Sequence, residues 1–152
     1  MERDKIIKEL KQYFKITELV CPHVYNKHGE NSWKFLDTES LETLLVLRTK
    51  ILCVPLICNS YSKNLTQRGF RCNLCELNKK KTIKGVLSIS AHSTGKGWDL
   101  TSPNMTAEEM RNKIKAKSYL LPYPVRIEKN VDWLHIDCYN DNDDEKITYF
   151  NE

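Results

Sequence analysis

The sequence has no long apolar run and few residues that interrupt helices and strands. No stretch approaches the roughly 18 apolar residues of a membrane span, so we expect no membrane-spanning segment. Its charged, helically periodic start, MERDKIIKELKQYF, has no apolar core of a secretory signal, so we expect synthesis in the cytoplasm without a signal peptide. With five glycines and five prolines in 152 residues, the composition is that of a globular protein forming one domain over 1–152.

Neither sign of charge dominates. The chain has 24 Lys and Arg against 20 Asp and Glu, a net charge of +4. This mild excess favours an anionic partner such as a cell envelope, but it does not select one. Because no stripe of basic residues with interleaved aromatics is present, we expect no nucleic-acid partner.

Six cysteines without a signal peptide predict free thiols rather than a disulfide framework. Cys53 and Cys58 lie in the apolar segment ILCVPLICN and are predicted to be small buried hydrophobes. Cys72 and Cys75 form a C-x-x-C motif, which can hold zinc or take part in thiol redox chemistry.

A zinc site at this C-x-x-C motif needs two further ligands. Cys21 and His23 in the segment CPH could supply them, but nothing in the sequence brings them near, and a structural turn at Pro22 explains the segment better. Redox chemistry is the weaker alternative, because Cys72 and Cys75 lie in a polar segment without a βαβ context.

Hydrophobic periodicity and turn residues predict an α+β fold with a small, mainly antiparallel sheet flanked by helices. The predicted helices cover 3–14, 40–52 and 106–119, the second capped by Asp37 or Thr38 and the third by a capping box of Thr106 and Glu109. The predicted strands are 55–59, 86–90, 97–101, 125–129, 133–139 and 146–150, with an acidic turn at 140–145. Residues 15–36 and 60–84 are predicted to be long loops.

A possible metal site begins in the segment SAHSTGKGWDL, residues 90–100. His92 and Asp99 lie on the two arms of a predicted strand-turn-strand, and His135 lies on a later strand. Three protein ligands and one open position are typical of catalytic zinc, and two imidazoles with one carboxylate leave the metal a strong Lewis acid. The alternative is an ordinary polar hairpin with hydrogen-bonded histidines.

Two aspartates accompany His135. Asp132, three residues earlier, could act as a general base on metal-bound water. On a regular strand the two residues would face opposite ways, so Asp132 would have to lie at the strand entrance. Asp137, two residues later and on the same face as His135, could orient that histidine or simply be solvated.

These motifs resemble those of the M15 peptidases, the D-alanyl-D-alanine carboxypeptidase and phage endolysin group. S-A-H-S-T-G-K-G-W-D (90–99) is similar to the family motif S-x-H-x-x-G-x-A-x-D, with Gly97 in place of alanine. D-W-L-H (132–135) is similar to E-x-x-H, with aspartate for glutamate. With the segments 14–21 and 36–61, the resemblance spans roughly residues 14 to 140, and QRGFRCNLC and LPYPVRIE are closest to members carried by bacteriophages and gut bacteria.

The resemblance implies a Hedgehog/DD-peptidase fold and one catalytic Zn²⁺ held by His92, Asp99 and His135. It further implies that Asp132 activates zinc-bound water and that Ser90 lies beside the site. The family arginine that holds substrate or oxyanion is replaced here by Ser62, so we expect Lys63 or Arg71 to take its role, although lysine lacks the bidentate fork.

The resemblance thus predicts a zinc metallopeptidase that hydrolyses peptide bonds of bacterial peptidoglycan, as a carboxypeptidase or an endolysin-type endopeptidase. We expect a monomer, made in a bacterial cytoplasm and encoded by a phage or a bacterium, that acts at the cell wall or periplasm after release. The alternative is a non-catalytic zinc-containing module of the same fold that binds cell wall or a partner.

Overall fold

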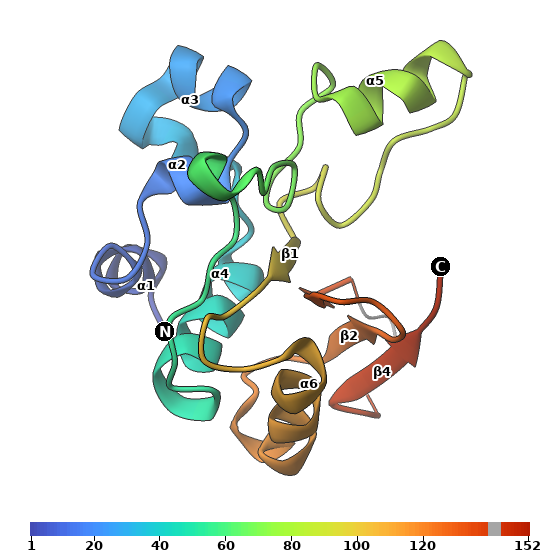
Figure 1. Cartoon of the computed structure of the whole chain (residues 1–152). Coiled ribbons are helices and arrows are strands. Elements are labelled where there is room, and N and C mark those ends of the chain that lie inside the picture. The colour runs from blue at the N-terminus through green and yellow to red at the C-terminus, as the bar shows by residue number, and fades with distance from the viewer. Residues whose placement is uncertain (140–143) are drawn as a thin grey trace.

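The computed structural model describes residues 1–139 and 144–152, and the elements below are those of this part of the chain (Figure 1). The helices are α1 (Arg3–Leu10), α2 (Ile16–Leu19), α3 (Pro22–His28), α4 (Thr38–Val46), α5 (Glu76–Ile83) and α6 (Ala107–Ala116). Short 3-10 segments cover Gly29–Phe35, Tyr61–Lys63 and Ser118–Leu120, and a π-helical turn, Leu47–Ile51, extends α4. The strands are β1 (Gly97–Leu100), β2 (Val125–Glu128), β3 (Leu134–Asp137) and β4 (Ile147–Phe150).

The four strands form one sheet in the order β1-β3-β2-β4. The pairs β1–β3 and β2–β3 are antiparallel, whereas the edge strand β4 runs parallel to β2. The α+β class is therefore confirmed, but the sheet is mixed, because the chain returns after β3 to place β4 alongside β2 in the same direction. The more specific Hedgehog/DD-peptidase assignment stays a prediction.

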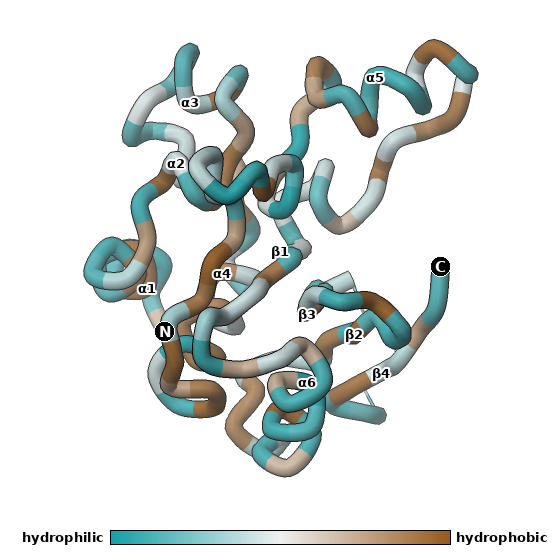
Figure 2. Tube along the Cα trace, viewed as in Figure 1, coloured by the Kyte–Doolittle hydropathy of each residue, from teal (hydrophilic) through white to brown (hydrophobic). Residues whose placement is uncertain are grey.

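Helix α4 is the central helix of the core. As predicted, Asp37 caps it, accepting a hydrogen bond from the backbone N–H of Ser40 at 3.1 Å. Its residues Leu41, Leu44 and Leu45 are buried, and Figure 2 shows hydrophobic stretches of the tube beside the α4 label. The indole of the buried Trp98 donates to the Ser40 carbonyl at 3.1 Å, which fixes β1 against this helix.

The capping box of Thr106 and Glu109 begins α6 as predicted, and the strands predicted at 97–101, 125–129, 133–139 and 146–150 are present. The prediction of a loop over 15–36 is wrong, because this segment contains α2, α3 and the 3-10 segment Gly29–Phe35. Pro22 does not interrupt α3, since it stands at the first position of the helix, where its missing N–H costs nothing. The loop predicted at 60–84 contains α5. Residues 86–90 are not a strand, because no ladder partner lies beside them, and 55–59 contribute only an isolated bridge between Ile57 and Thr101.

All six cysteines are free thiols, as predicted. Cys58 is buried, but Cys53 is exposed, because the chain turns there with a positive φ of 56° at the end of the α4 extension. Among the described residues, no helix combines the length and apolarity that crossing a bilayer requires. Most of the predicted acidic turn, residues 140–143, lies outside the described residues.

Candidate metal centre

One face of the sheet carries a row of polar side chains. Side chains alternate between faces along a strand, so Trp98 and Leu100 of β1 face the core while Asp99 faces the other way. Asp99 pairs directly with His135 of β3. On the same face of the sheet lie Asp137 of β3 and, from β2, Arg126 and Glu128.

His92 reaches this face from the tight turn that precedes β1. The turn is closed by a hydrogen bond from the Lys96 N–H to the Ala91 carbonyl at 2.8 Å. Gly95 adopts a φ of +72° in this turn, a conformation that glycine takes without a steric penalty. The Gly95 carbonyl accepts from the N–H of Asp37 and the hydroxyl of Ser40, so the start of α4 holds the turn in place.

His92, Asp99 and His135 come together as the sequence predicts, with one ligand atom of each lying within 4.8 Å of the others. His92 Nε2 is 3.3 Å from Asp99 Oδ2, and His135 Nδ1 is 2.7 Å from Asp99 Oδ1. All three side chains are buried, although a carboxylate and two imidazoles are costly to bury without a compensating interaction. The group could therefore hold a metal ion.

The hydrogen-bond partners of the two histidines suit metal binding. A carbonyl can only accept, so His92 Nδ1 donates to Gly69 O at 2.9 Å and leaves the Nε2 lone pair facing Asp99. His135 Nε2 lies 2.7 Å from Asp137 Oδ2, which leaves Nδ1 facing Asp99. A second ring nitrogen held by a carbonyl or carboxylate is the usual arrangement for a ligating histidine, so this donor set fits a metal ion.

Asp137 orients His135 and is itself fixed, so of the two possibilities left open by the sequence, the first holds. Its carboxylate accepts two hydrogen bonds from Arg126, each 2.9 Å long, besides the contact with His135. Only 1% of Asp137 is exposed. Such a paired fork is geometrically rigid, and it determines which imidazole nitrogen is available for a metal.

The protonation states follow from this arrangement. Burial by itself raises the pKa of Asp99, but the two imidazoles beside it, His135 at 2.7 Å and His92 at 3.3 Å, hold the pKa of this carboxyl well below its usual range. Burial by itself lowers the pKa of His135, but Asp137 and Asp99 raise this pKa to about 9. Without a metal, His135 is therefore protonated at neutral pH, and a bound metal would have to displace that proton.

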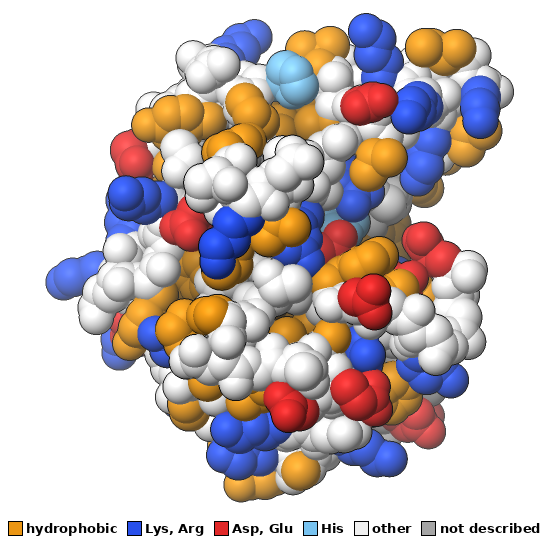
Figure 3. All heavy atoms as spheres, in the orientation of Figure 1, with side chains coloured by type: hydrophobic (Ala, Val, Ile, Leu, Met, Phe, Trp, Pro, Cys, Tyr) orange, Lys and Arg blue, Asp and Glu red, His pale blue; other side chains and the backbone are white. Residues whose placement is uncertain are grey.

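A cavity of about 630 Å³ opens over the three residues. It is lined by Arg71, Leu77, Lys81, Ser90, Ala91, His92, Asp99, Arg126, Glu128, Trp133, His135, Asp137, Phe150 and Glu152. Figure 3 shows a hollow between the part of the molecule that contains α5 and the part that contains β2 and β4, and side chains of both charges lie around it.

Two of the predicted substrate residues line this cavity. Arg71 Nη2 lies 3.6 Å from Asp99 Oδ2, so its guanidinium forms an ion pair with the carboxylate of the candidate metal site. Ser90 is half-buried at the cavity edge, where its hydroxyl contacts Ser93. Lys63, by contrast, is exposed on the 3-10 turn Tyr61–Lys63 and does not line the cavity.

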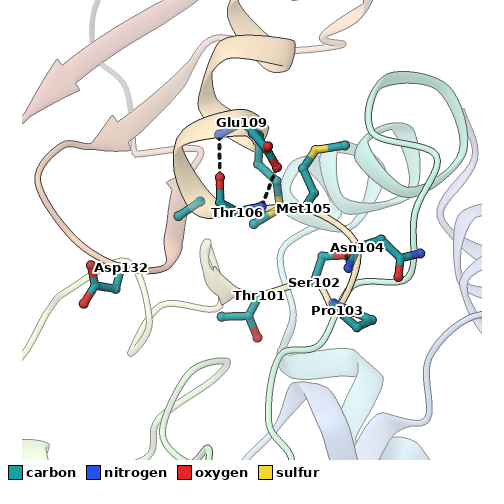
Figure 4. A pocket seen from close by; sticks show the side chains of 10 residues that line it. Thr101, Ser102, Pro103, Asn104, Met105, Thr106, Glu109 and Asp132 are labelled. Carbon is teal, nitrogen blue, oxygen red and sulfur yellow. Dashed lines mark hydrogen bonds between the residues drawn. The ribbon is translucent and has the colours of Figure 1, made fainter.

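Asp132 lies at the entrance of β3, as the register argument requires, but it lines a different pocket. That pocket is formed by residues 101–107, Glu109 and Met110, and Figure 4 shows Asp132 on the loop before β3, across it from Asn104. Asp132 is exposed. Its role as general base remains a prediction.

Glu128, which the sequence analysis does not single out, lines the cavity together with His92, Asp99 and His135, as do Asp137 and Glu152. Glu128 is only 7% exposed, and burial raises the pKa of its carboxyl. The signal was present in the alternation V-R-I-E, which places Arg126 and Glu128 on one strand face, as L-H-I-D does for His135 and Asp137.

A second group of residues could also hold a metal ion: Cys21, His23, Cys72 and Cys75, with ligand atoms that all lie within 4.8 Å of one another. No pattern in the sequence predicts that the two halves of this group meet. They meet because Val20 pairs with Phe70 in an isolated parallel bridge, which brings the start of α3 to the segment before α5.

Comparisons of the chain with protein-family models, with curated proteins and with solved structures found no match. The relation to the M15 peptidases therefore stays a prediction from the motifs.

The protonation of His135 is directly measurable. In zinc-free protein we expect its imidazole to titrate with a pKa of about 9, followed by NMR of the ring nuclei, because two carboxylates stabilise the charged form. Asp137→Asn should move this pKa down towards the ordinary value for histidine, about 6.5. A wild-type His135 that already titrates near that value would contradict the arrangement.

Proposed function

We propose that the chain is a zinc-dependent peptidase that cleaves peptide bonds of bacterial peptidoglycan. The observation that carries the proposal is the convergence of His92, Asp99 and His135 in one cavity with a buried carboxylate, Glu128, and a guanidinium, Arg71. Zinc held by the three residues would supply Lewis acidity towards a peptide carbonyl and lower the pKa of water.

The remaining steps belong to the chain's own side chains. Glu128, with its raised pKa, is suited to accept a proton from water and return it to the leaving amine. Arg71 is suited to bind a substrate carboxylate or a developing oxyanion, and Ser90 to donate a hydrogen bond at the cavity edge. The aromatic rings of Trp133 and Phe150 supply apolar wall for the substrate.

Mass spectrometry of purified peptidoglycan digested with the zinc-loaded protein tests this proposal. We expect new peptide termini with the wild type and none with His92→Ala, because that variant loses a metal ligand. Wild-type protein that contains zinc but releases no peptide would contradict it.

The same digest separates the alternative of a non-catalytic binding module. Such a module would sediment with peptidoglycan and leave it intact. The buried, pKa-shifted Glu128 favours the enzyme, because a binding module has no need for a carboxylate beside the metal.

A further inference from the structure

We propose that Cys21, His23, Cys72 and Cys75 form a second, structural zinc site, which fixes the segment that positions His92 and Arg71. This inference does not depend on the peptidase activity. Cys21 and His23 stand at the start of α3, and Cys72 and Cys75 stand just before α5, with Cys72 49 residues after His23.

The distances match a tetrahedral ion. With Zn–S near 2.3 Å and Zn–N near 2.0–2.1 Å, tetrahedral geometry separates two sulfurs by about 3.8 Å and a sulfur from a nitrogen by about 3.6 Å. Here Cys72 Sγ and Cys75 Sγ are 4.0 Å apart, and His23 Nδ1 lies 3.6 Å from Cys72 Sγ and 3.8 Å from Cys75 Sγ. Cys21 completes the group, with its sulfur within 4.8 Å of the other three ligand atoms.

The donor set is one that closes a structural site. Three thiolates and one imidazole fill all four positions of zinc and leave none for water. The set therefore differs in chemistry from His92, Asp99 and His135, which leave a position open. Burial also favours a structural role: Cys21 and Cys75 are buried, and Cys72 is half-buried.

The backbone around Cys72 is built to hold this geometry. The N–H of Leu74 points to Cys72 Sγ at 3.4 Å, and the N–H of Cys75 donates to the Cys72 carbonyl at 3.2 Å. The buried Asn78 donates from its side-chain amide to the carbonyls of Arg71 and Cys72, at 3.1 and 3.0 Å. These hydrogen bonds connect the C-x-x-C turn to Asn78 of α5.

The site lies at one end of a short segment, residues 68–71, that also contacts the first metal centre. Phe70 N–H donates to the Leu19 carbonyl, and Arg71 N–H donates to the His92 carbonyl. Gly69 accepts from His92 Nδ1. Zinc bound by Cys72 and Cys75 would therefore restrain the backbone that sets the tautomer of His92 and the direction of Arg71.

Metal analysis of the purified full-length protein tests the site. We expect two zinc ions per wild-type chain, one in Cys72→Ser and one in His92→Ala. Cys53→Ser is the matched control, because Cys53 is exposed and outside the group, and it should retain two. Zinc content in Cys72→Ser equal to that of the wild type would overturn the proposal.

A second variant keeps the test informative if Cys72→Ser folds poorly. Cys72→His should restore the second zinc, since Cys₂His₂ is also a structural zinc donor set. In cobalt-substituted protein, the thiolate charge-transfer absorption should disappear in Cys72→Ser and persist in His92→Ala. Two results would overturn the site. One is a charge-transfer band that disappears in His92→Ala and persists in Cys72→Ser. The other is a single zinc ion in both the wild type and Cys72→His. None of these measurements depends on peptidase activity of the protein. The second zinc site can therefore be disproved while the proposed function stands, and the reverse.

Trypsin tests the restraint on residues 68–71. Arg68 is buried and Arg71 half-buried, so we expect cleavage after them in Cys72→Ser but not in wild-type or Cys53→Ser protein. Equal cleavage in all three proteins would overturn the restraining role.

Discussion

Glu128→Gln is expected to lower the rate of peptidoglycan cleavage by about 10²–10⁴-fold, the usual contribution of a general acid–base group. Glutamine has nearly the volume of glutamate, so the packing of β2 should be preserved, but it cannot accept a proton from water. Glu128 is buried in the cavity of the three metal-ligand residues, and burial raises the pKa of its carboxyl, which suits a group that accepts and returns a proton. Initial rates from zinc-loaded protein, with zinc content measured in parallel, give the comparison.

Asp132→Asn is the matched control for Glu128→Gln, because it makes the same acid-to-amide change outside the cavity. We expect its rate to stay close to that of the wild type, since Asp132 is exposed and lines a different pocket. If Asp132→Asn abolished cleavage while Glu128→Gln did not, the family-based assignment of Asp132 would be confirmed and the role we propose for Glu128 would be wrong.

The sequence predicts the elements that local signals define. The capping residues Asp37 and Thr106 mark the starts of α4 and α6, and period-2 alternation marks β1, β2 and β3. The motif S-A-H-S-T-G-K-G-W-D and His135 predict the ligand residues, because a tight turn and a pair of neighbouring strands bring them together. These are short-range properties or the direct pairing of predicted strands.

What the sequence does not predict depends on long-range placement. Glu128 joins the cavity only because β2 pairs with β3, and Asp132 leaves it because the chain bends before β3, where Asn130 has a positive φ of 62°. The meeting of Cys21 with Cys75 likewise needs the bridge between Val20 and Phe70. Alternation places Glu128 on one face of β2, but the pairing of β2 with β3, the bend before β3 and the Val20–Phe70 bridge are not encoded by periodicity or spacing.

Gly95→Ala should destabilise the protein by about 2–5 kcal/mol. An added Cβ would face the cost of a left-handed conformation, about 1–2 kcal/mol, since Gly95 has a φ of +72°. It would also overlap the carbonyl oxygen of Phe35, and such overpacking costs about 1–3 kcal/mol. Because backbone rather than a flexible side chain is in the way, the turn that presents His92 would have to shift, and zinc affinity should fall with stability.

Gly85→Ala separates the two causes. Gly85 also has a positive φ, +69°, but an added Cβ would meet nothing within 4 Å. Denaturant unfolding should therefore show a loss of only about 1–2 kcal/mol, with zinc content unchanged. Equal losses in the two variants would mean that backbone conformation alone accounts for both, and that the packing of the turn against residues 35–37 does not hold His92 in place.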